Sequence, residues 1–87
     1  MTIDQIKEKA FAKMLFNFRM AMDTDNSESY AVYIKMSYDV TKSLFTLDIM
    51  SVGEAYDLMD ASRNQATAEY IKFKSAMDSL KSVLNDQ

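Results

Sequence analysis

The sequence predicts an all-α fold, a bundle of three helices in which the third helix is the longest. The 87 residues include one glycine and no proline, whereas hairpins and all-β folds need those residues at special backbone positions. Apolar residues recur at alternating steps of three and four along much of the chain, which is the spacing of packed helices. Two capping-box patterns mark helix starts. We therefore expect residues 1–87 to form a single helical domain.

The first helix is predicted to begin at about Ile3, because Thr2 and Gln5 form a capping-box pattern. Its apolar stripe consists of Phe11, Met14, Leu15, Phe18, Ala21 and Met22. Phe16 and Met20 fall outside this stripe, so the helix is apolar around much of its circumference. We interpret it as a core helix that contacts neighbours on two sides. The alternative is a partner-binding or membrane-surface helix, since basic residues flank its aromatic side chains.

Residues 23–29 form the first polar break in the pattern. Asp23 and Asp25 resemble the start of an EF-hand calcium loop, but the glycine position holds Glu28 and the final acidic position holds Ile34. We therefore expect no metal site here. Asp25 and Glu28 are instead predicted to cap the second helix.

Residues 30–50 carry two competing patterns. Six apolar residues alternate with smaller or polar ones between Tyr30 and Val40, which is typical of a strand. The same stretch contains a helical ladder that continues beyond the alternation: Tyr30, Tyr33, Ser37, Val40, Leu44 and Leu47. Residues 41–43 contain no turn-type glycine or asparagine that could close a hairpin, which favours a helix. An α+β fold in the order α-β-β-α remains the alternative.

The third helix is predicted to run from Val52 to Leu84, with Ser51 as its N-cap and Glu54 completing a capping box. Its ladder comprises Val52, Tyr56, Met59, Ala66, Tyr70, Phe73, Met77, Leu80 and Leu84, with Arg63 at the remaining step. At about 1.5 Å per residue this helix is roughly 50 Å long and overhangs the other two. We expect it either to break near residues 62–65 or to pair with a second copy in a homodimer. The candidate self-association residues are Arg63, Ala66, Tyr70, Phe73, Met77 and Leu80.

The composition argues against catalysis. The chain contains no histidine and no cysteine, which removes the commonest general base and the commonest transition-metal ligands. Glu54, Asp57 and Asp60 are closely spaced on the third helix, but we interpret them as a solvated acidic face. No glycine-rich phosphate loop is present. We expect no enzyme activity, no cofactor and no metal.

The charge distribution argues against nucleic-acid binding, and the lack of a long apolar run argues against a membrane span. The net charge is −3, and residues 23–60 carry eight acidic and two basic side chains, which disfavours contact with phosphate backbones. The alternative is a structural or nucleic-acid-associated homodimer that uses Lys72, Lys74 and Lys81 on the basic C-terminal helix. There is no secretory signal and no run of about 18 apolar residues, so we expect a cytoplasmic protein without a membrane partner.

Protein binding is the remaining class of function. Eight methionines and ten aromatic residues are many for this length, and both types are enriched at protein–protein interfaces. Phe16, Met20, Tyr38 and Ile71 fall off the best apolar stripes, so they are the candidates for an exposed contact patch. We therefore expect a protein partner.

Residues 44–60 read LFTLDIMSVGEAYDLMD, in which a helix end with Leu-x-Ile-Met is followed by Ser-x-x-Glu-Ala and Leu-x-Asp. This stretch resembles helical hairpins in small accessory proteins of Gram-positive phages and mobile elements. The resemblance implies a stoichiometric binder or inhibitor of host proteins, including CRISPR effectors.

Overall fold

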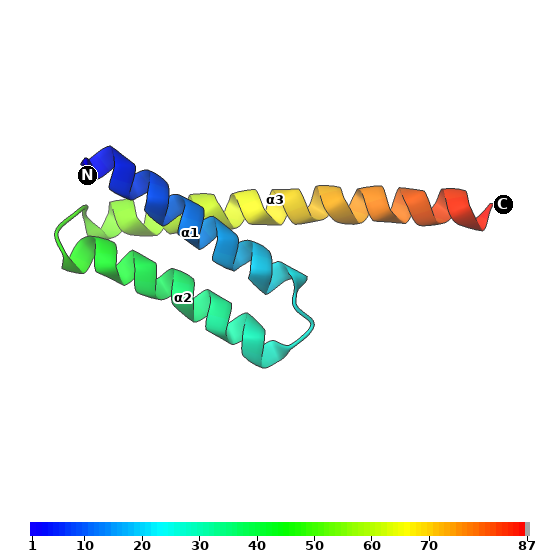
Figure 1. Ribbon diagram of the computed structural model, residues 1–87, viewed down its shortest axis with the longest axis horizontal. Coiled ribbons are helices and arrows are strands. Elements are labelled where there is room, and N and C mark those ends of the chain that lie inside the picture. Colours follow the sequence, from blue (N-terminus) through cyan, green and yellow to red (C-terminus); the bar gives the residue numbers. More distant parts are fainter. Residues whose placement is uncertain (87) are drawn as a thin grey trace.

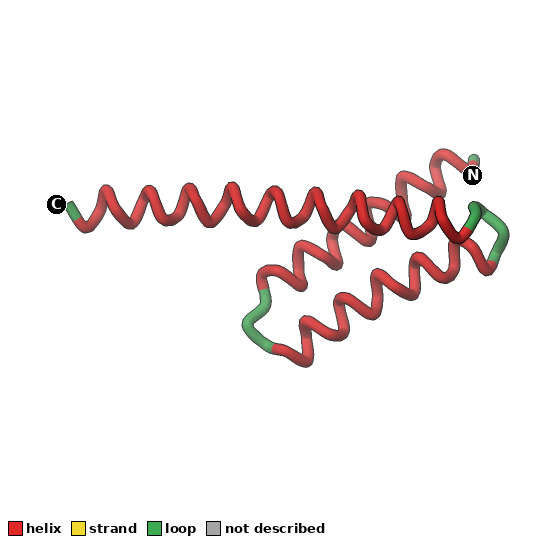
Figure 2. The backbone as a smooth tube through the Cα atoms, turned by 180° about the vertical axis from the view of Figure 1, so that it is seen from behind, coloured by secondary structure: helices red, strands yellow, loops and turns green. Residues whose placement is uncertain are grey.

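The computed structural model describes residues 1–86, which form three α-helices (Figure 1). These are α1 (Ile3–Asp23), α2 (Ser27–Thr46) and α3 (Val52–Asn85). Two short connections join them (Figure 2), and none of the described residues lies in a strand. The predicted all-α fold is confirmed, and the alternative α-β-β-α order is wrong.

The predicted starts of α1 and α3 are confirmed by their capping geometry. The backbone N–H of Gln5 donates to the side chain of Thr2 at 3.1 Å, and the backbone N–H of Thr2 donates to the side chain of Gln5 at 2.9 Å. At α3 the backbone N–H of Glu54 donates to the Ser51 hydroxyl at 3.1 Å. The Glu54 carboxylate accepts from the Ser51 hydroxyl at 3.2 Å and not from the Ser51 backbone N–H, so the N-cap is confirmed but the predicted capping box is only half formed. Each cap satisfies an amide that has no partner within its helix.

The cap of α2 is Asn26, so the prediction of Asp25 was wrong by one residue. The Asn26 side-chain oxygen accepts from the backbone N–H groups of Glu28 at 2.8 Å and Ser29 at 3.1 Å. Asparagine and aspartate cap helices about equally well, and the sequence offers both side by side. The position of the first helical turn therefore decides which of the two takes the role.

The buried positions of α2 follow a helical period, because Ser37, Thr41 and Leu44 face the bundle. Val32, Met36 and Tyr38, which belong to the alternating pattern, are exposed. A strand face would place every second residue of that pattern in the core. The alternation was therefore a coincidence of composition.

The α2–α3 connection is a tight turn that closes without glycine. The backbone N–H groups of Ile49 and Met50 both donate to the carbonyl of Leu44, at 3.0 and 3.2 Å. Asp48 has a φ of 56°, in the left-handed region that usually favours glycine or asparagine. The turn brings Met50 back into the core at the start of α3.

The core lies where α1 packs against both other helices, while α2 and α3 contact each other less. Its buried apolar residues are Ala10, Met14, Leu15, Phe18, Ala21, Leu44, Met50, Ala55, Met59 and Ala66. Ser37, Thr41 and Ser62 are also fully buried. Their hydroxyls donate to the carbonyls of Tyr33, Ser37 and Met59 within their own helices. Small side chains satisfied in this way let helices pack closely without an orphaned polar group.

Helix α3 is continuous from Val52 to Asn85, so of the two alternatives for the third helix the break near residues 62–65 is wrong. Ser62 is fully buried, and its hydroxyl donates to the Met59 carbonyl at 2.7 Å, so its polarity requires no loop. Arg63 points outward and its Nη2 lies 2.9 Å from Oδ1 of Asp60. The residues of α3 buried in the bundle are Ala55, Met59, Ser62 and Ala66. At about 100° per residue Arg63 lies roughly 70° from the centre of that face, so it does not occupy a packed position.

The molecule is elongated, with principal extents of 58 × 27 × 21 Å. Its radius of gyration is 16.2 Å, whereas a compact domain of this length has about 12 Å. The excess comes from α3, which continues well past the α1–α2 hairpin (Figure 1). Across residues 1–86, no helix is sufficiently long and apolar to cross a membrane.

Candidate functional site: the distal half of α3

The distal half of α3 presents apolar side chains to solvent. Every residue from Ile71 to Asp86 is exposed. We define the distal stripe as Phe73, Met77, Leu80 and Leu84, which are 59, 37, 52 and 60% exposed. At about 100° per residue these four lie within roughly 60° of one another around the helix. They form one continuous apolar line along about three helical turns.

The distal stripe continues the face of α3 that is buried in the bundle. Counted around the helix from Phe73, Ala55 returns to the same angle, and Ser62 and Ala66 lie within roughly 20° of it. α1 and α2 cover this face as far as Ala66, which is 1% exposed. Beyond that point the cover ends within about one turn, because Glu69 and Tyr70 are half-buried against the end of α1 and every residue from Ile71 to Asp86 is exposed. The helix therefore carries one apolar face, of which the first half packs in the core and the second half is free.

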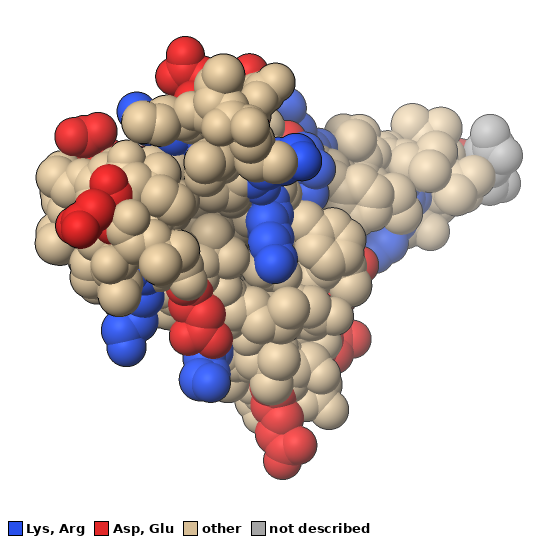
Figure 3. All heavy atoms as spheres, turned by 60° about the vertical axis from the view of Figure 1, so that its left-hand side comes forward, with Lys and Arg blue, Asp and Glu red and all other residues tan. Residues whose placement is uncertain are grey.

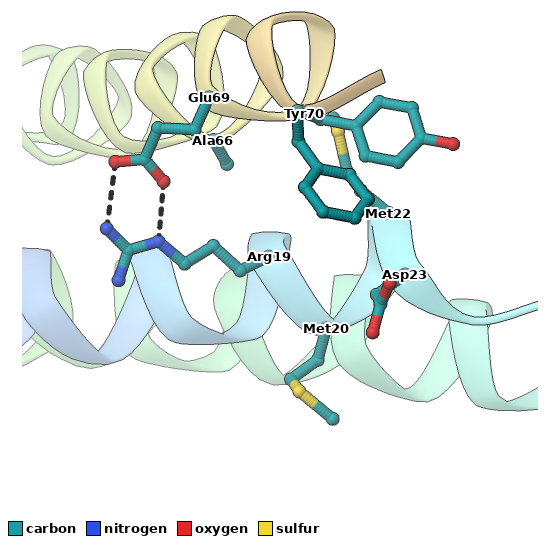
Figure 4. Close-up of a pocket in the computed structure, with 8 residues that line it drawn as sticks. Arg19, Met20, Met22, Asp23, Ala66, Glu69 and Tyr70 are labelled. Atoms are coloured by element: carbon teal, nitrogen blue, oxygen red, sulfur yellow. Dashed lines mark hydrogen bonds and ion pairs between the residues drawn. The ribbon is translucent and has the colours of Figure 1, made fainter. Parts of the chain in front are cut away.

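A groove lies where the distal half of α3 leaves the bundle, between the end of α1 and α3 (Figure 4). It has a volume of about 360 Å³ and is lined by Arg19, Met20, Met22, Asp23, Ala66, Glu69, Tyr70 and Phe73. The lining is mostly apolar, with charged groups at its edge. Met20 leaves α1 on the side away from α3 (Figure 4) and also borders a second hollow with Ser29 and Tyr33 of α2.

A bidentate ion pair joins the two walls of the groove. Nε and Nη2 of Arg19 on α1 donate to the two carboxylate oxygens of Glu69 on α3, at 2.7 and 2.8 Å (Figure 4). The side-chain amide of Gln65 adds a third hydrogen bond to Glu69 at 3.2 Å. The hydrogen bonds from Arg19, then from Gln65, lower the pKa of Glu69 to about 2. Because both charged groups are about half exposed, we assign the pair an orienting role more than a stabilising one.

The predicted self-association residues occupy four different environments. Met77 and Leu80 lie on the distal stripe, and Tyr70 and Phe73 line the groove at its base. Ala66 is instead part of the core, and Arg63 lies off the packed face beside Asp60.

The predicted partner-binding residues are distributed over the three helices. Phe16 on α1 is 56% exposed, and Ile71 on α3 is 61% exposed on the side opposite the distal stripe. Tyr38 on α2 is 45% exposed and packs edge-to-face on Tyr56, with the ring centroids 6.3 Å apart. Met20 is the only one of the four that lines the groove.

Arg19, Met22, Asp23 and Glu69 were missed as site residues. A signal existed for Glu69, because it interrupts a column of small and apolar residues (Ala55, Ser62, Ala76 and Val83) on α3. A charge within such a column requires a partner or solvent. Its partner Arg19 lies fifty positions away in the sequence, so the pairing became visible only in the fold.

Three lysines flank the distal stripe, and they lie on both of its sides. Lys74 and Lys81 lie along one side of the stripe, whereas Lys72 lies on the other side. Acidic and basic groups are interspersed over the bundle, and the receding end of α3 is covered mostly by uncharged residues (Figure 3). Among residues 1–86, no group of three or more acidic side chains is close enough to hold a metal ion.

No family model, no curated protein and no solved structure matches the chain.

Proposed function

We propose that this chain is a helical protein-binding module whose contact surface is the distal stripe of α3. The observation that supports the proposal most directly is the continuity of the apolar face, which is packed up to Ala66 and exposed from Phe73 to Leu84. Contiguous exposed apolar side chains are typical of interaction surfaces. Grooves and helix faces of this kind accept an amphipathic helix through anchors spaced three and four residues apart.

The energy available from covering the distal stripe is substantial. Fully burying one large apolar side chain contributes about 1.5–3 kcal/mol. The four residues of the stripe are between about two fifths and three fifths exposed, so covering all of them contributes about 3–6 kcal/mol before the costs of association. That contribution gives a measurable affinity only if the distal half of α3 is already helical before it binds, so that binding does not also have to order it.

The hairpin of α1 and α2 supplies that preorganisation. A free helix of about 15 residues is marginally stable in water, because nucleation is unfavourable. Here the distal half extends a helix already nucleated by the Ser51 cap and by packing as far as Ala66. The Arg19–Glu69 pair adds a bidentate contact between α1 and α3 at the point where α3 leaves the bundle.

The finer form of the proposal is a cytoplasmic phage or mobile-element protein that binds a host protein stoichiometrically and inhibits it. Only the resemblance of residues 44–60 to such proteins supports this form. A binding module of this kind needs no catalytic group and no cofactor.

The test compares two aspartate substitutions on opposite sides of the same exposed segment. Leu80→Asp places a charge on the distal stripe, whereas Ile71→Asp is the matched control on the opposite face, with 61% exposure against 52% for Leu80. Ile71 was a partner-binding candidate from the sequence, and we exclude it from the proposed contact surface because it lies on the side of α3 opposite the stripe. We expect Leu80→Asp to abolish both self-association and the retention of specific proteins from a host lysate. The control should preserve both activities, and circular dichroism should show that both variants keep the bundle. If Leu80→Asp retains every interaction of the wild type, the distal stripe is not the contact surface.

A further inference from the structure

We infer that the occupant of the distal stripe is a second copy of this chain, bound with its α3 antiparallel to the first. The inference rests on the proposed function and adds the identity and orientation of the partner. It follows from the exposed area, from the position of the free face relative to the bundle, and from the spacing of the stripe.

The area matches that of a modest homodimer. Phe73, Met77, Leu80, Val83 and Leu84 are each between 37 and 60% exposed. Each therefore exposes at most on the order of 100 Å², since even aromatic side chains bury only about 150–250 Å² when fully covered. Two copies together then cover up to about 1,000 Å², which is at the lower bound for a specific interface. An interface of this size is typical of weak, reversible association.

The bundle blocks a parallel arrangement. The distal stripe continues the face of α3 that packs on α1 and α2. If the α3 of a second copy lies on this stripe in the same direction, its first half overlaps the α1 of the first copy. The second copy's own α1 and α2 would need that same space. In an antiparallel pair each bundle lies beyond the tip of the other α3, and neither obstructs the pairing.

The end of α1 fixes how far the two helices overlap. Met22 and Asp23 line the groove together with Phe73, so the space beside α3 becomes free from about Phe73 onward. An antiparallel partner that reaches this point places its Leu84 opposite Phe73, and its Leu80 then falls opposite Met77. In this register the spacing of the stripe is the same in both directions along the pair, so each apolar residue of one stripe lies opposite an apolar residue of the other.

The two sides of this interface differ. On one side Ala76 and Val83 extend the apolar contact. On the other side Lys74 of each copy faces Lys81 of the other, which is repulsive and is screened by salt. Dimerisation should therefore strengthen about two- to threefold between 50 and 500 mM salt. Nucleic-acid binding changes in the opposite direction.

The first experiment measures dimerisation by sedimentation equilibrium over a concentration series of the full chain. We expect Leu80→Asp to weaken the dimer at least 100-fold and Ile71→Asp to leave it within twofold of the wild type. Lys74→Glu should tighten the dimer about fivefold, because the new carboxylate faces Lys81 of the second copy. In a parallel pair the same change sets the new carboxylate against Glu69 and weakens the dimer, which overturns the orientation.

The second experiment tests the register through disulfides, since the chain contains no cysteine of its own. In the antiparallel dimer the two Leu84 positions lie about 17 Å apart along the axis, too far for a disulfide. Phe73→Cys and Leu84→Cys should therefore not cross-link when each is oxidised alone, but a mixture of the two should give a covalent heterodimer. Cross-linking of either variant with itself contradicts the antiparallel register.

The two proposals fail in different ways. If the wild type stays monomeric at 500 μM in 500 mM salt, the second copy is not the occupant. Should Leu80→Asp still lose a specific captured protein while Ile71→Asp keeps it, the proposed function stands and only the inference fails. If neither capture nor self-association depends on Leu80, both fail.

Discussion

Asn17 of α1 offers the sharpest test of how the core is built. It is 1% exposed, and its Nδ2 has no hydrogen-bond partner among the described residues. It lies on the inward face of α1 with Ala10, Met14 and Ala21. A buried amide donor without a partner costs about 1–3 kcal/mol. Replacing this amide with an apolar group should therefore stabilise the fold, although most core substitutions destabilise.

The substitution is Asn17→Leu, which keeps four heavy atoms in the side chain and the same branch point. It removes the unpaired donor and adds apolar burial worth about 0.8 kcal/mol per methyl group. The bulkier methyl groups introduce packing strain of about 1–3 kcal/mol. We expect a net gain of about 1–2 kcal/mol in the free energy of unfolding. For a domain of this size the Tm should rise by about 4–15 °C.

The assay is urea and thermal denaturation followed by circular dichroism, on a Leu80→Asp background so that self-association does not contribute. Asn17→Ala is the matched control, because it also removes the amide but leaves a small void, and we expect it to be within about 1 kcal/mol of neutral. If Leu and Ala at position 17 lower the free energy of unfolding by similar amounts, the loss of stability comes from removing the amide. The Asn17 side chain then makes a favourable interaction, and our reasoning is wrong.

Three further predictions concern a charge, a turn and a cap. Glu69 has its pKa lowered to about 2 by Arg19 and Gln65, so its contribution to stability is complete above about pH 4.5 and is lost as the pH falls towards 2. Thermal melts across this range should show the difference between wild type and Glu69→Gln vanishing at the acidic end, and a difference independent of pH contradicts the assignment. Asp48→Gly should raise the unfolding free energy by about 0.5 kcal/mol, because the φ of 56° costs glycine nothing; a lower urea midpoint refutes this. Ser51→Ala should cost about 1 kcal/mol through the lost cap on Glu54, whereas Ser51→Asp should restore most of it.

The fold class could be predicted from the sequence because helix starts are local. The caps at Thr2 and Ser51 depend on residues three positions apart, and both were predicted correctly. The ladder along α3 also predicted that Phe73, Met77 and Leu80 share one face of the helix. The overhang of the third helix followed from its predicted length relative to the others.

The errors came from properties that packing decides. Ser62 looked like a polar interruption, yet in the fold it is a small residue at a close helix contact, satisfied by the Met59 carbonyl. Arg63 fitted the ladder because steps of three and four residues can follow either of two neighbouring rows of side chains on a helix. Packing against α1 decides which row is buried, and Arg63 belongs to the other row. The Arg19–Glu69 pair joins residues from opposite ends of the chain, and no local pattern connects them.

Because α3 is unbroken, the direction in which the distal stripe faces, relative to the hairpin of α1 and α2, depends on the number of residues between them. Ala66 in the core and Phe73 on the distal stripe are seven residues apart, close to two full turns. One residue inserted between them turns the free side by about 100° away from the hairpin, whereas seven inserted residues restore the phase and add roughly 10 Å of reach. Whatever the distal stripe binds is therefore held at a fixed distance and a fixed angle from the hairpin.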